Sequence, residues 1–374
     1  MIFCACANNV DTDVSADDVE STLQLLLEEA INSSYDQLPG VSASIISPAL
    51  NEAWSGASGY DSSKKEDTLK IDQPFRIASI TKTFVAAAIL RLHELDSLSI
   101  EDPLSKYTSD EHQIILSSDD YDLNKIKIKH CLNHSSGLFD YAMGGRKYIE
   151  ISIGQPKKRW TRTEQLQFAV DHGEKLWEPN GGYRYSDTGY ILLGEIIGGF
   201  YDGDLALGLR TLLKFQDLGL THTWLETLED SPIPGVDPVH RYFRRDDLTT
   251  YDPSNDLYGG GGLMSTSTDL TKFVAALFEG RIYEKDETLE LMLAGHALNP
   301  SYDPTTDDRY KDYRYGMWHI SLYGKKAFIH SGLWGTHMIY VPVMKTACTV
   351  NYTKGSYSRM LKKMILVVKN QMQE

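Results

Sequence analysis

The sequence has little cysteine, an excess of acidic over basic residues, and no long apolar stretch. Four cysteines in 374 residues are too few and too scattered for a disulfide scaffold or a zinc cluster. The formal net charge of −15 gives an acidic surface that repels a phosphate backbone, so we expect no nucleic-acid partner. Because no run of 18 uncharged apolar residues occurs, no transmembrane helix is predicted.

The overall composition is that of a folded globular protein. Hydrophobic residues make up 41% and charged residues 24% of the chain, both near the averages of soluble domains. A length of 374 residues suffices for one large domain or two ordinary ones with a sizeable core. Disorder is not expected.

The first sixteen residues differ from the rest. An apolar stretch from Met1 to Ala7 is followed by an acidic spacer, which resembles the remnant of an export signal or a flexible tether, although the positive segment of a complete signal is missing. Cys6 stands where a lipoprotein carries its lipidated cysteine and is a candidate lipid anchor. We expect a periplasmic or extracellular location; the alternative is an ordinary frayed terminus.

Hydrophobic periodicity places strands near both ends of the chain and helices between them. Predicted strands cover 41–47, 54–60, 315–322, 326–330, 338–342 and 347–352, and predicted helices cover 17–33, 75–95, 165–172, 190–200, 265–278 and 360–373. Terminal strands around a helical middle predict an α+β fold, in which the two chain ends complete one antiparallel sheet flanked by helices. We divide the domain 17–374 into a sheet lobe, 17–102 with 266–374, and a mostly helical lobe, 103–265, with a site between them.

Several common catalytic motifs are missing. There is no Gly-x-Ser-x-Gly, no His-Glu-x-x-His and no Gly-Lys-Ser/Thr. The glycine run 259–262 lacks the last glycine of a dinucleotide fingerprint and is interpreted as a close-packed turn. Binding of an organic cofactor is therefore not predicted.

Ser79-Ile80-Thr81-Lys82 opens the predicted apolar helix at 75–95. A serine and a lysine three residues apart share one face of a helix, so the lysine nitrogen can lie beside the hydroxyl. Lysine removed from water can take the serine proton, and the helix start offers free N–H groups to an oxyanion. Ser79 is a candidate nucleophile. The alternative is that Ser79 only caps the helix and that Lys82 lies at the surface.

Two further segments could complete such a site. Tyr185-Ser186-Asp187 could bring a phenol near Lys82, where a cation lowers the pKa of a tyrosine. His330-Ser331-Gly332 ends an apolar strand along which a substrate could lie. In isolation each is a polar loop or a strand end.

Taken in order, the three segments resemble the motifs of the penicillin-recognising serine hydrolases, which include class C β-lactamases, D-alanyl-D-alanine carboxypeptidases and related carboxylesterases. The resemblance spans nearly the whole chain and includes the segments 75–78, 132–138 and 261–266 together with Gly335 and Pro342. It implies a β-lactamase/transpeptidase-like fold.

The resemblance also implies residue roles. Ser79 would form an acyl-enzyme, with Lys82 and Tyr185 as the base system and the backbone N–H groups of Ser79 and Leu333 as the oxyanion hole. Asp187, His330, Ser331 and Gly332 would contact the substrate. His130 and His134 are spaced like a metal pair, but the family match places His134 in a structural turn.

Two departures affect the substrate. His330 stands where class C β-lactamases have lysine, which favours peptidases and esterases over penicillin hydrolysis. Asp187 replaces the usual asparagine; its carboxylate could pair with Lys82, accept from a substrate amine, or cap a helix. We expect a serine hydrolase acting on a D-Ala-D-Ala-like peptide end or an ester, with β-lactamase activity third. A non-catalytic penicillin-binding or envelope-interaction protein is the alternative from another class.

Overall fold

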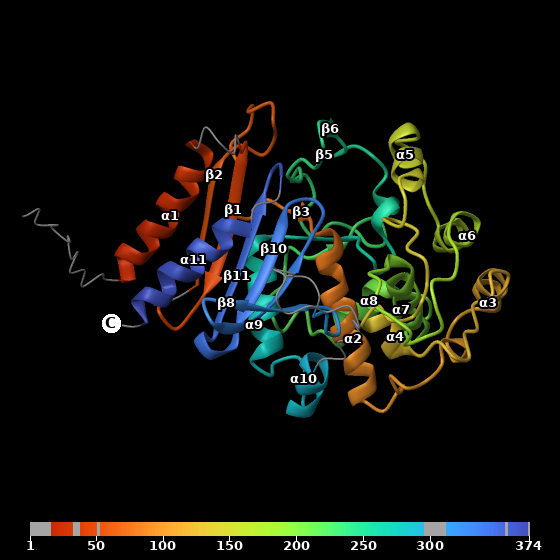
Figure 1. The fold of residues 1–374 in the computed structure, drawn as a ribbon. Coiled ribbons are helices and arrows are strands. Elements are labelled where there is room, and N and C mark those ends of the chain that lie inside the picture. The colour runs from red at the N-terminus through yellow and green to blue at the C-terminus, as the bar shows by residue number, and fades with distance from the viewer. Residues whose placement is uncertain (1–15, 33–37, 51–52, 295–311, 356–357, 373–374) are drawn as a thin grey trace, which may run out of the picture.

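A six-stranded antiparallel sheet is built from both ends of the chain (Figure 1). The computed structural model describes residues 16–32, 38–50, 53–294, 312–355 and 358–372. The strand order is β2-β1-β11-β10-β9-β8. The strands are β1 (Gly40–Ile46), β2 (Trp54–Gly59), β8 (Trp318–Leu322), β9 (Lys325–Ser331), β10 (Thr336–Val341) and β11 (Thr346–Tyr352). As the sequence predicts, the N-terminal hairpin and the C-terminal strands share one sheet, with Val41 opposite Tyr352.

Two helices cover one face of this sheet and one covers the other. The helices α1 (Ala16–Asn32) and α11 (Ser358–Gln371) lie side by side on the first face, and α9 (Ser267–Phe278) packs on the second (Figure 1). Thr266 caps α9 by accepting a hydrogen bond from the backbone N–H of Asp269 at 3.1 Å. Leu23 and Leu27, on the apolar stripe of α1, are fully buried.

The larger core lies on the α9 side, around α2 (Thr81–Glu94). Every residue of α2 except His93 is buried, because the helix passes through the middle of the molecule. Phe84 of α2 stacks on Phe273 of α9 with 3.6 Å between ring centroids, which joins this helix to the sheet layer. The other helices of this region are α3 (Asp110–Ser117), α4 (Ile128–Leu132), α5 (Lys147–Gly154), α6 (Arg162–His172), α7 (Asp187–Gly199), α8 (Leu205–Leu212) and α10 (Asp286–Leu293). Of these, α7, α8 and α10 pack directly on α2.

Short strands connect the helical region to the start of α2. β3 (Phe75–Arg76), β7 (Leu263–Ser265) and β4 (Trp224–Leu225) form a small sheet, and β5 (Tyr242–Phe243) with β6 (Asp246–Asp247) forms a hairpin. The sequence pattern places 75 and 76 in the helix, which is wrong: Phe75 pairs with Ser265 of β7. A single 3₁₀ turn, Ala78–Ile80, separates β3 from α2 and carries Ser79.

The α+β architecture with its antiparallel sheet and flanking helices is confirmed. The lobe boundaries at 102/103 and 265/266 stay a prediction. The predicted tether 1–16, with Cys6, lies outside the described residues except for Ala16, where α1 begins. Cys131 and Cys348 are buried and unpaired, as expected of small apolar side chains. None of the helices in the described part of the chain is both long and apolar enough to cross a bilayer.

Candidate active site

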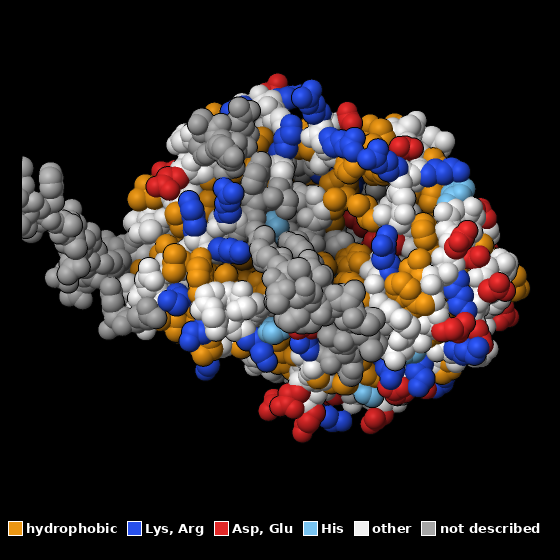
Figure 2. Space-filling view, viewed as in Figure 1, with side chains coloured by type: hydrophobic (Ala, Val, Ile, Leu, Met, Phe, Trp, Pro, Cys, Tyr) orange, Lys and Arg blue, Asp and Glu red, His pale blue; other side chains and the backbone are white. Residues whose placement is uncertain are grey.

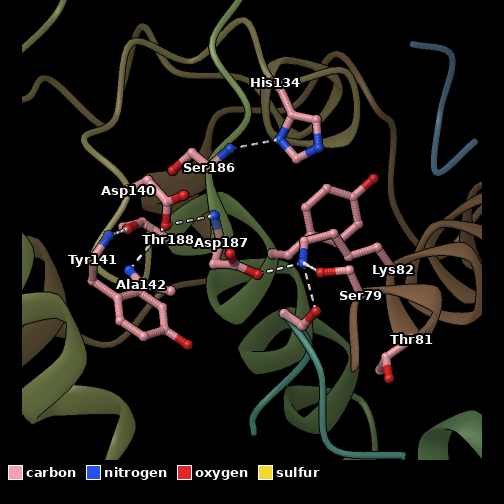
Figure 3. A network of polar contacts seen from close by, with 12 residues as sticks. Ser79, Thr81, Lys82, His134, Asp140, Tyr141, Ala142, Ser186, Asp187 and Thr188 are labelled. Atoms are coloured by element: carbon pink, nitrogen blue, oxygen red, sulfur yellow. Dashed lines mark hydrogen bonds and ion pairs between the residues drawn. The ribbon is translucent and has the colours of Figure 1, made fainter. Parts of the chain in front are cut away.

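Ser79 and Lys82 lie together at the start of α2, as their spacing predicts. The Lys82 ammonium is fully buried and donates to Ser79 Oγ at 3.0 Å, to the carbonyl oxygen of Gly260 at 2.6 Å, and to the Asp187 carboxylate (Figure 3). Three acceptors match the three N–H bonds of an ammonium group. Lys82 is thereby fixed in one rotamer with one bond directed at the candidate nucleophile.

Asp187 forms the buried ion pair with Lys82. It is the first residue of α7, whose N-cap position is held by Ser186. Of the three interpretations that the sequence leaves open, the structure places the carboxylate against the lysine and not in a capping bond. Removing one partner of such a pair leaves an uncompensated buried charge, typically costing about 3–5 kcal/mol.

Two further carboxyl groups, which sequence reasoning did not single out, lie near this pair. Asp140 accepts from the backbone N–H groups of Asp187 at 3.3 Å and Ala142 at 3.0 Å, and burial together with the Asp187 charge raises its pKa (Figure 3). Burial and Asp187 likewise raise the pKa of Asp256 to about 6, while Lys82 opposes the rise. Asp140 and Asp256 come from distant loops, so no local spacing points to them.

Glycines 260 and 261 separate two of these carboxyl groups. A Cβ on Gly260 would press against the Asp187 side chain, and a Cβ on Gly261 would collide with the carboxyl of Asp256. The glycine run is thus a close-packed turn, as the sequence suggests. Its absence of side chains lets the Gly260 carbonyl reach Lys82 while Asp256 packs on the other side.

Tyr185 lies over the lysine. The Lys82 nitrogen is 5.0 Å from the centre of its ring, and the ring stacks on Trp318 at 5.7 Å between centroids. Burial and the Asp187 charge hold the pKa of Tyr185 well above its ordinary value, and the neighbouring Ser79 side chain offsets only part of this rise. The expectation that the nearby cation lowers the pKa of this phenol is therefore wrong. Tyr185 is a neutral phenol beside the serine.

His134 supports Tyr185 from behind. Its ring lies 4.2 Å from the Tyr185 ring, and its Nδ1 accepts a hydrogen bond from the backbone N–H of Ser186 at 3.1 Å. Burial, with the charge of Lys82, holds the pKa of His134 well below its usual value, so the imidazole is neutral. His134 also has φ +59, which places it in a left-handed turn. It orients Tyr185 without adding charge.

Only part of the third predicted segment, His330-Ser331-Gly332, reaches the cavity in front of Ser79. Ser331 and Leu333 line the cavity in front of Ser79, whereas His330 is completely buried behind it. His330 Nε2 lies 3.1 Å from the Tyr313 hydroxyl, and burial lowers its pKa to about 3. Gly332 packs against the carbonyl of Ile77, where a Cβ would not fit. The structure brings Ser331 and Leu333, but neither His330 nor Gly332, to the cavity wall.

The cavity in front of Ser79 has a volume of about 750 Å³, suited to a small organic substrate. Figure 2 shows a hollow on this face, with hydrophobic side chains around it and acidic atoms inside. Its wall is mostly aromatic and aliphatic, and its charged members are two aspartates; it consists of Ser79, Ala142, Met143, Tyr148, Ile149, Tyr183, Tyr185, Asp187, Asn255, Asp256, Trp318, Ser331, Leu333 and Trp334. No Lys, Arg or His is among these described lining residues.

Leu333 is the residue expected to share the oxyanion hole with Ser79. Its backbone N–H makes no hydrogen bond with any residue that the structure describes, and its side chain is 46% exposed. The N–H of Ser79 lies in the first turn before α2, where backbone donors have no helical acceptor. Both donors are therefore free to bind a ligand oxygen.

Comparisons with known proteins agree with this geometry. A family model described as "Beta-lactamase" matches residues 28–368. A penicillin-binding protein of Bacillus subtilis (strain 168) is 28% identical over 242 residues, covering 61% of this chain and 50% of that protein. Esterase EstB of Burkholderia gladioli is 27% identical over 160 residues, covering 42% of this chain and 38% of that protein. The chain spans about half the length or less of these curated relatives.

Solved structures share the fold over nearly the whole chain. The D-amino acid amidase of Ochrobactrum anthropi SV3 complexed with L-phenylalanine has a TM-score of 0.77 and 25% identity, covering 95% of this chain and 99% of that one. EstCE1, titled a hydrolase with promiscuous acyltransferase activity, has a TM-score of 0.72 and 18% identity, covering 96% and 100%. At 18% identity the second likeness shows the fold alone.

Proposed function

Since the β-lactamase family model matches residues 28–368, the chain belongs to that family of serine hydrolases, and we propose that it hydrolyses a small amide or ester through an acyl-enzyme on Ser79. One observation carries the proposal. Ser79 Oγ receives a hydrogen bond from a fully buried lysine at the wall of a cavity large enough for a small organic substrate. Such a pairing is the arrangement that activates a serine for nucleophilic attack.

Acylation begins when Ser79 Oγ bonds to the substrate carbonyl carbon. Lys82 takes the serine proton as it passes one of its own protons to the Asp187 carboxylate, which it already contacts. Tyr185, as a neutral phenol, donates a proton to the leaving nitrogen or oxygen while the scissile bond breaks, and is reprotonated from Lys82. Asp187 then returns its proton to Lys82, which restores the ion pair. Water then attacks the ester, which releases the acid and restores the Ser79 hydroxyl.

The carbonyl oxygen becomes negative in both steps, and the N–H groups of Ser79 and Leu333 would receive it. Donors fixed in place before the reaction lower the barrier because they need no reorganisation; one such donor is typically worth about 100- to 1,000-fold in rate. Leu333 lines the cavity together with Ser79. Ser331, at the end of β9, lies along the same wall and would contact the acyl chain.

The negative charge of the cavity wall favours substrates that carry an ammonium group over substrates that carry a carboxylate. D-Ala-D-Ala peptides and penicillins both carry a free carboxylate, which would enter beside Asp187 and Asp256 with no lining cation to receive it among the described residues. An ammonium group finds favourable partners there, above all Asp256, which has no ion pair in the described part of the chain. The aromatic wall favours an aromatic or aliphatic side chain. We therefore place amides and esters of apolar amino acids first.

Carboxylate-bearing peptides and β-lactams are the second and third substrate classes. A non-catalytic penicillin-binding role is disfavoured by the intact contact between Ser79 and Lys82. The choice between amide and ester stays open because both leaving groups need the same serine and the same proton donor.

Four substrates and one variant test the proposal. An apolar amino-acid amide, the matching nitrophenyl ester, a D-Ala-D-Ala peptide and a chromogenic cephalosporin are assayed with wild type and with Ser79→Ala. We expect turnover of the amide or ester, loss of that turnover in Ser79→Ala, and a mass adduct on Ser79 with a phosphonate ester. Full activity of Ser79→Ala, or turnover of the carboxylate-bearing substrates alone, would refute the proposal.

We also propose that the protein acts outside the cytoplasm, in the periplasm or extracellularly, with Cys6 as a lipid anchor. The apolar start of the sequence and the similarity to a penicillin-binding protein support this location. Fractionation of the native host and a Cys6→Ser variant test it: a wholly cytoplasmic protein refutes export, and unchanged membrane association in Cys6→Ser refutes the anchor.

A further inference from the structure

A buried arginine lies behind the cavity wall. Arg241 precedes the β5–β6 hairpin and is only 3% exposed. Its Nε donates to the carbonyl of Leu248 at 2.8 Å, and its backbone N–H donates to Thr249 Oγ1 at 2.9 Å. These bonds join the start and the end of the hairpin, so the side chain is held in one place.

Arg241 has no carboxylate partner at ion-pair distance among the described residues. Glu226, which directly follows β4, is paired with Arg76 instead. The Arg76 guanidinium donates two hydrogen bonds to the Glu226 carboxylate, at 2.5 and 2.7 Å. Asp247 is occupied by His240 at 2.7 Å. An unpaired buried cation costs free energy, and burial with the charge of Arg76 lowers the pKa of Arg241 to about 9. The charge of Asp256 also favours the protonated guanidinium, but the two groups form no ion pair, so hydrogen bonds and an aromatic ring hold the Arg241 side chain in place.

The guanidinium group instead faces an aromatic ring. Its central carbon lies 4.9 Å from the centre of the Trp334 ring, within the range of a cation–π contact. Trp334 is 6% exposed and follows Leu333, whose N–H is the proposed oxyanion donor. A ring held on its face by the cation fixes the backbone of the adjacent residue.

The same small cluster reaches the nucleophile. Trp334, Leu248 and Ala78 form an apolar cluster separate from the two main cores. Ala78 directly precedes Ser79 and has φ +45, a left-handed conformation that is unfavourable for alanine and needs support from its surroundings. The cluster thus contacts the residues next to both proposed oxyanion donors, and Arg241 closes it on the hairpin side.

We propose that Arg241 is a positioning residue for the oxyanion hole: its guanidinium holds the Trp334 ring, and through it the Leu333 N–H, at the distance from Ser79 that a tetrahedral intermediate requires. This inference rests on the proposed function, because it assumes an acyl-enzyme on Ser79. It assigns a catalytic consequence to the β5–β6 hairpin, which lies outside the cavity wall.

Arg241→Met tests the proposal, because it keeps much of the side-chain length and removes the cation. With a neutral ester as substrate, we expect kcat to fall about 10- to 100-fold, a fraction of what a whole oxyanion donor supplies, with KM changed less than about threefold. A boronic acid that forms a tetrahedral adduct with serine should lose affinity in the same proportion, whereas a non-covalent ligand should not. The midpoint of thermal unfolding should stay equal or rise, since an unpaired buried charge is removed.

Arg244→Met is the matched control. Arg244 lies at the exposed tip of the same hairpin with its guanidinium 5.6 Å from the Phe243 ring, so it should change none of these quantities. Trp334→Phe should lower kcat less than Arg241→Met, and the double variant should lose less than the product of the two single effects. If Arg241→Met does not fold, Trp334→Leu should show the same loss of kcat and of boronate affinity.

Two results would overturn the inference. One is full kcat in folded Arg241→Met; the other is an equal loss of affinity for boronate and non-covalent ligand, which indicates a general disturbance of the cavity. Failure of the proposed function itself is recognised separately, because wild type would then form no phosphonate adduct on Ser79. If wild type forms the adduct and Arg241→Met forms it at the same rate, only the role of Arg241 is refuted.

Discussion

Lys82 directs its three N–H bonds to Ser79, Gly260 and Asp187, so the serine and its activating group form one hydrogen-bonded unit. Tyr185 lies over the same ammonium. No single group acts alone in the proton transfer. The effects of single substitutions in this unit on the catalytic rate should therefore not add.

Lys82→Ala and Tyr185→Phe should each lower kcat by about 100- to 10,000-fold, because each removes a step of the same proton transfer. The double variant should lose little more than the worse single variant. Steady-state rates for the three variants measure this. Strictly multiplicative losses would show that the two residues act in separate steps.

Asp187→Asn should lower the rate at neutral pH by roughly 100-fold, because Lys82 loses the carboxylate that takes its proton. Lys82 must then lose a proton to solvent before it can act, so the acidic limb of the kcat/KM profile should move to higher pH. Rates across the pH range measure the shift. Asp246→Asn, on the exposed hairpin, serves as the control. An Asp187→Asn profile of unchanged shape, with only a loss of thermal stability, would leave the carboxylate a purely structural role.

Asp256 should make the stability and the substrate affinity depend on pH. Its folded-state pKa is raised from 3.8 to about 6 by burial and by Asp187, and the charges of Lys82 and Arg241 oppose the rise. The folded state therefore keeps a proton that the unfolded chain loses, and stability falls as pH rises from about 4 to about 6. Asp256→Asn should raise the unfolding midpoint by roughly 2–4 °C at pH 8 and hardly at pH 4.

For a substrate with an ammonium group, Asp256→Asn should also raise KM above pH 6, where the wild-type carboxylate is ionised. Calorimetry at two pH values and KM for matched cationic and neutral esters check the two parts. An equal change in KM for both esters would contradict the assignment of Asp256 to the ammonium group.

At the scale of elements, the end of β9 and the turn before α2 depend on a glycine. Gly332 packs directly against the backbone carbonyl of Ile77, so Gly332→Ala should push apart the two segments that carry the oxyanion donors. We expect a loss of stability of about 1–3 kcal/mol and a fall in kcat larger than any rise in KM. Gly154→Ala, with open space around its Cα at the end of α5, is the control for denaturation and kinetics. A fully active and stable Gly332→Ala enzyme would mean that the segments can separate without loss.

Structural features that depend on neighbouring residues could be predicted from the sequence, whereas features that depend on contacts between distant residues could not. The strands β1, β2, β9, β10 and β11 begin and end within two residues of their predicted ranges, because alternation of side chains is a local signal. Tyr315 to Met317, predicted as strand, precede β8 because Gly316 turns the chain at φ +82 and the Tyr315 N–H bonds the carbonyl of Met292. That partner is distant, so no local pattern reveals it.

The site divides in the same way. Ser79 and Lys82 could be predicted to meet because three residues on one helix set their separation. The pairing of Asp187 with Lys82 was one alternative among three, since it depends on how α7 packs against α2. Asp140, Asp256 and Arg241 gave no signal, because each reaches the site through an irregular loop from a different part of the chain. Burial likewise reversed the expected shift of the Tyr185 pKa.

At the scale of the whole molecule, the charge of −15 and the carboxylates in the cavity act in the same direction. A cationic substrate should be attracted over a distance that depends on salt, since the screening length falls from about 30 Å at about 0.01 M to about 3 Å at about 1 M. We expect kcat/KM for an amino-acid ester to fall several-fold over that range, and that of a neutral ester of equal size to change little. Equal responses of the two esters would exclude electrostatic steering.

The pairing of β1 with β11 also determines when the protein can fold during synthesis. Val41 finds its neighbour, Tyr352, only after all the residues between them have been synthesised. Until then the hairpin β1–β2 has one unsatisfied edge and an apolar face without its central strands. The sheet can therefore be completed only after β11 has been synthesised, and a ribosome that stops before residue 346 releases a chain with exposed strand edges that is prone to aggregate.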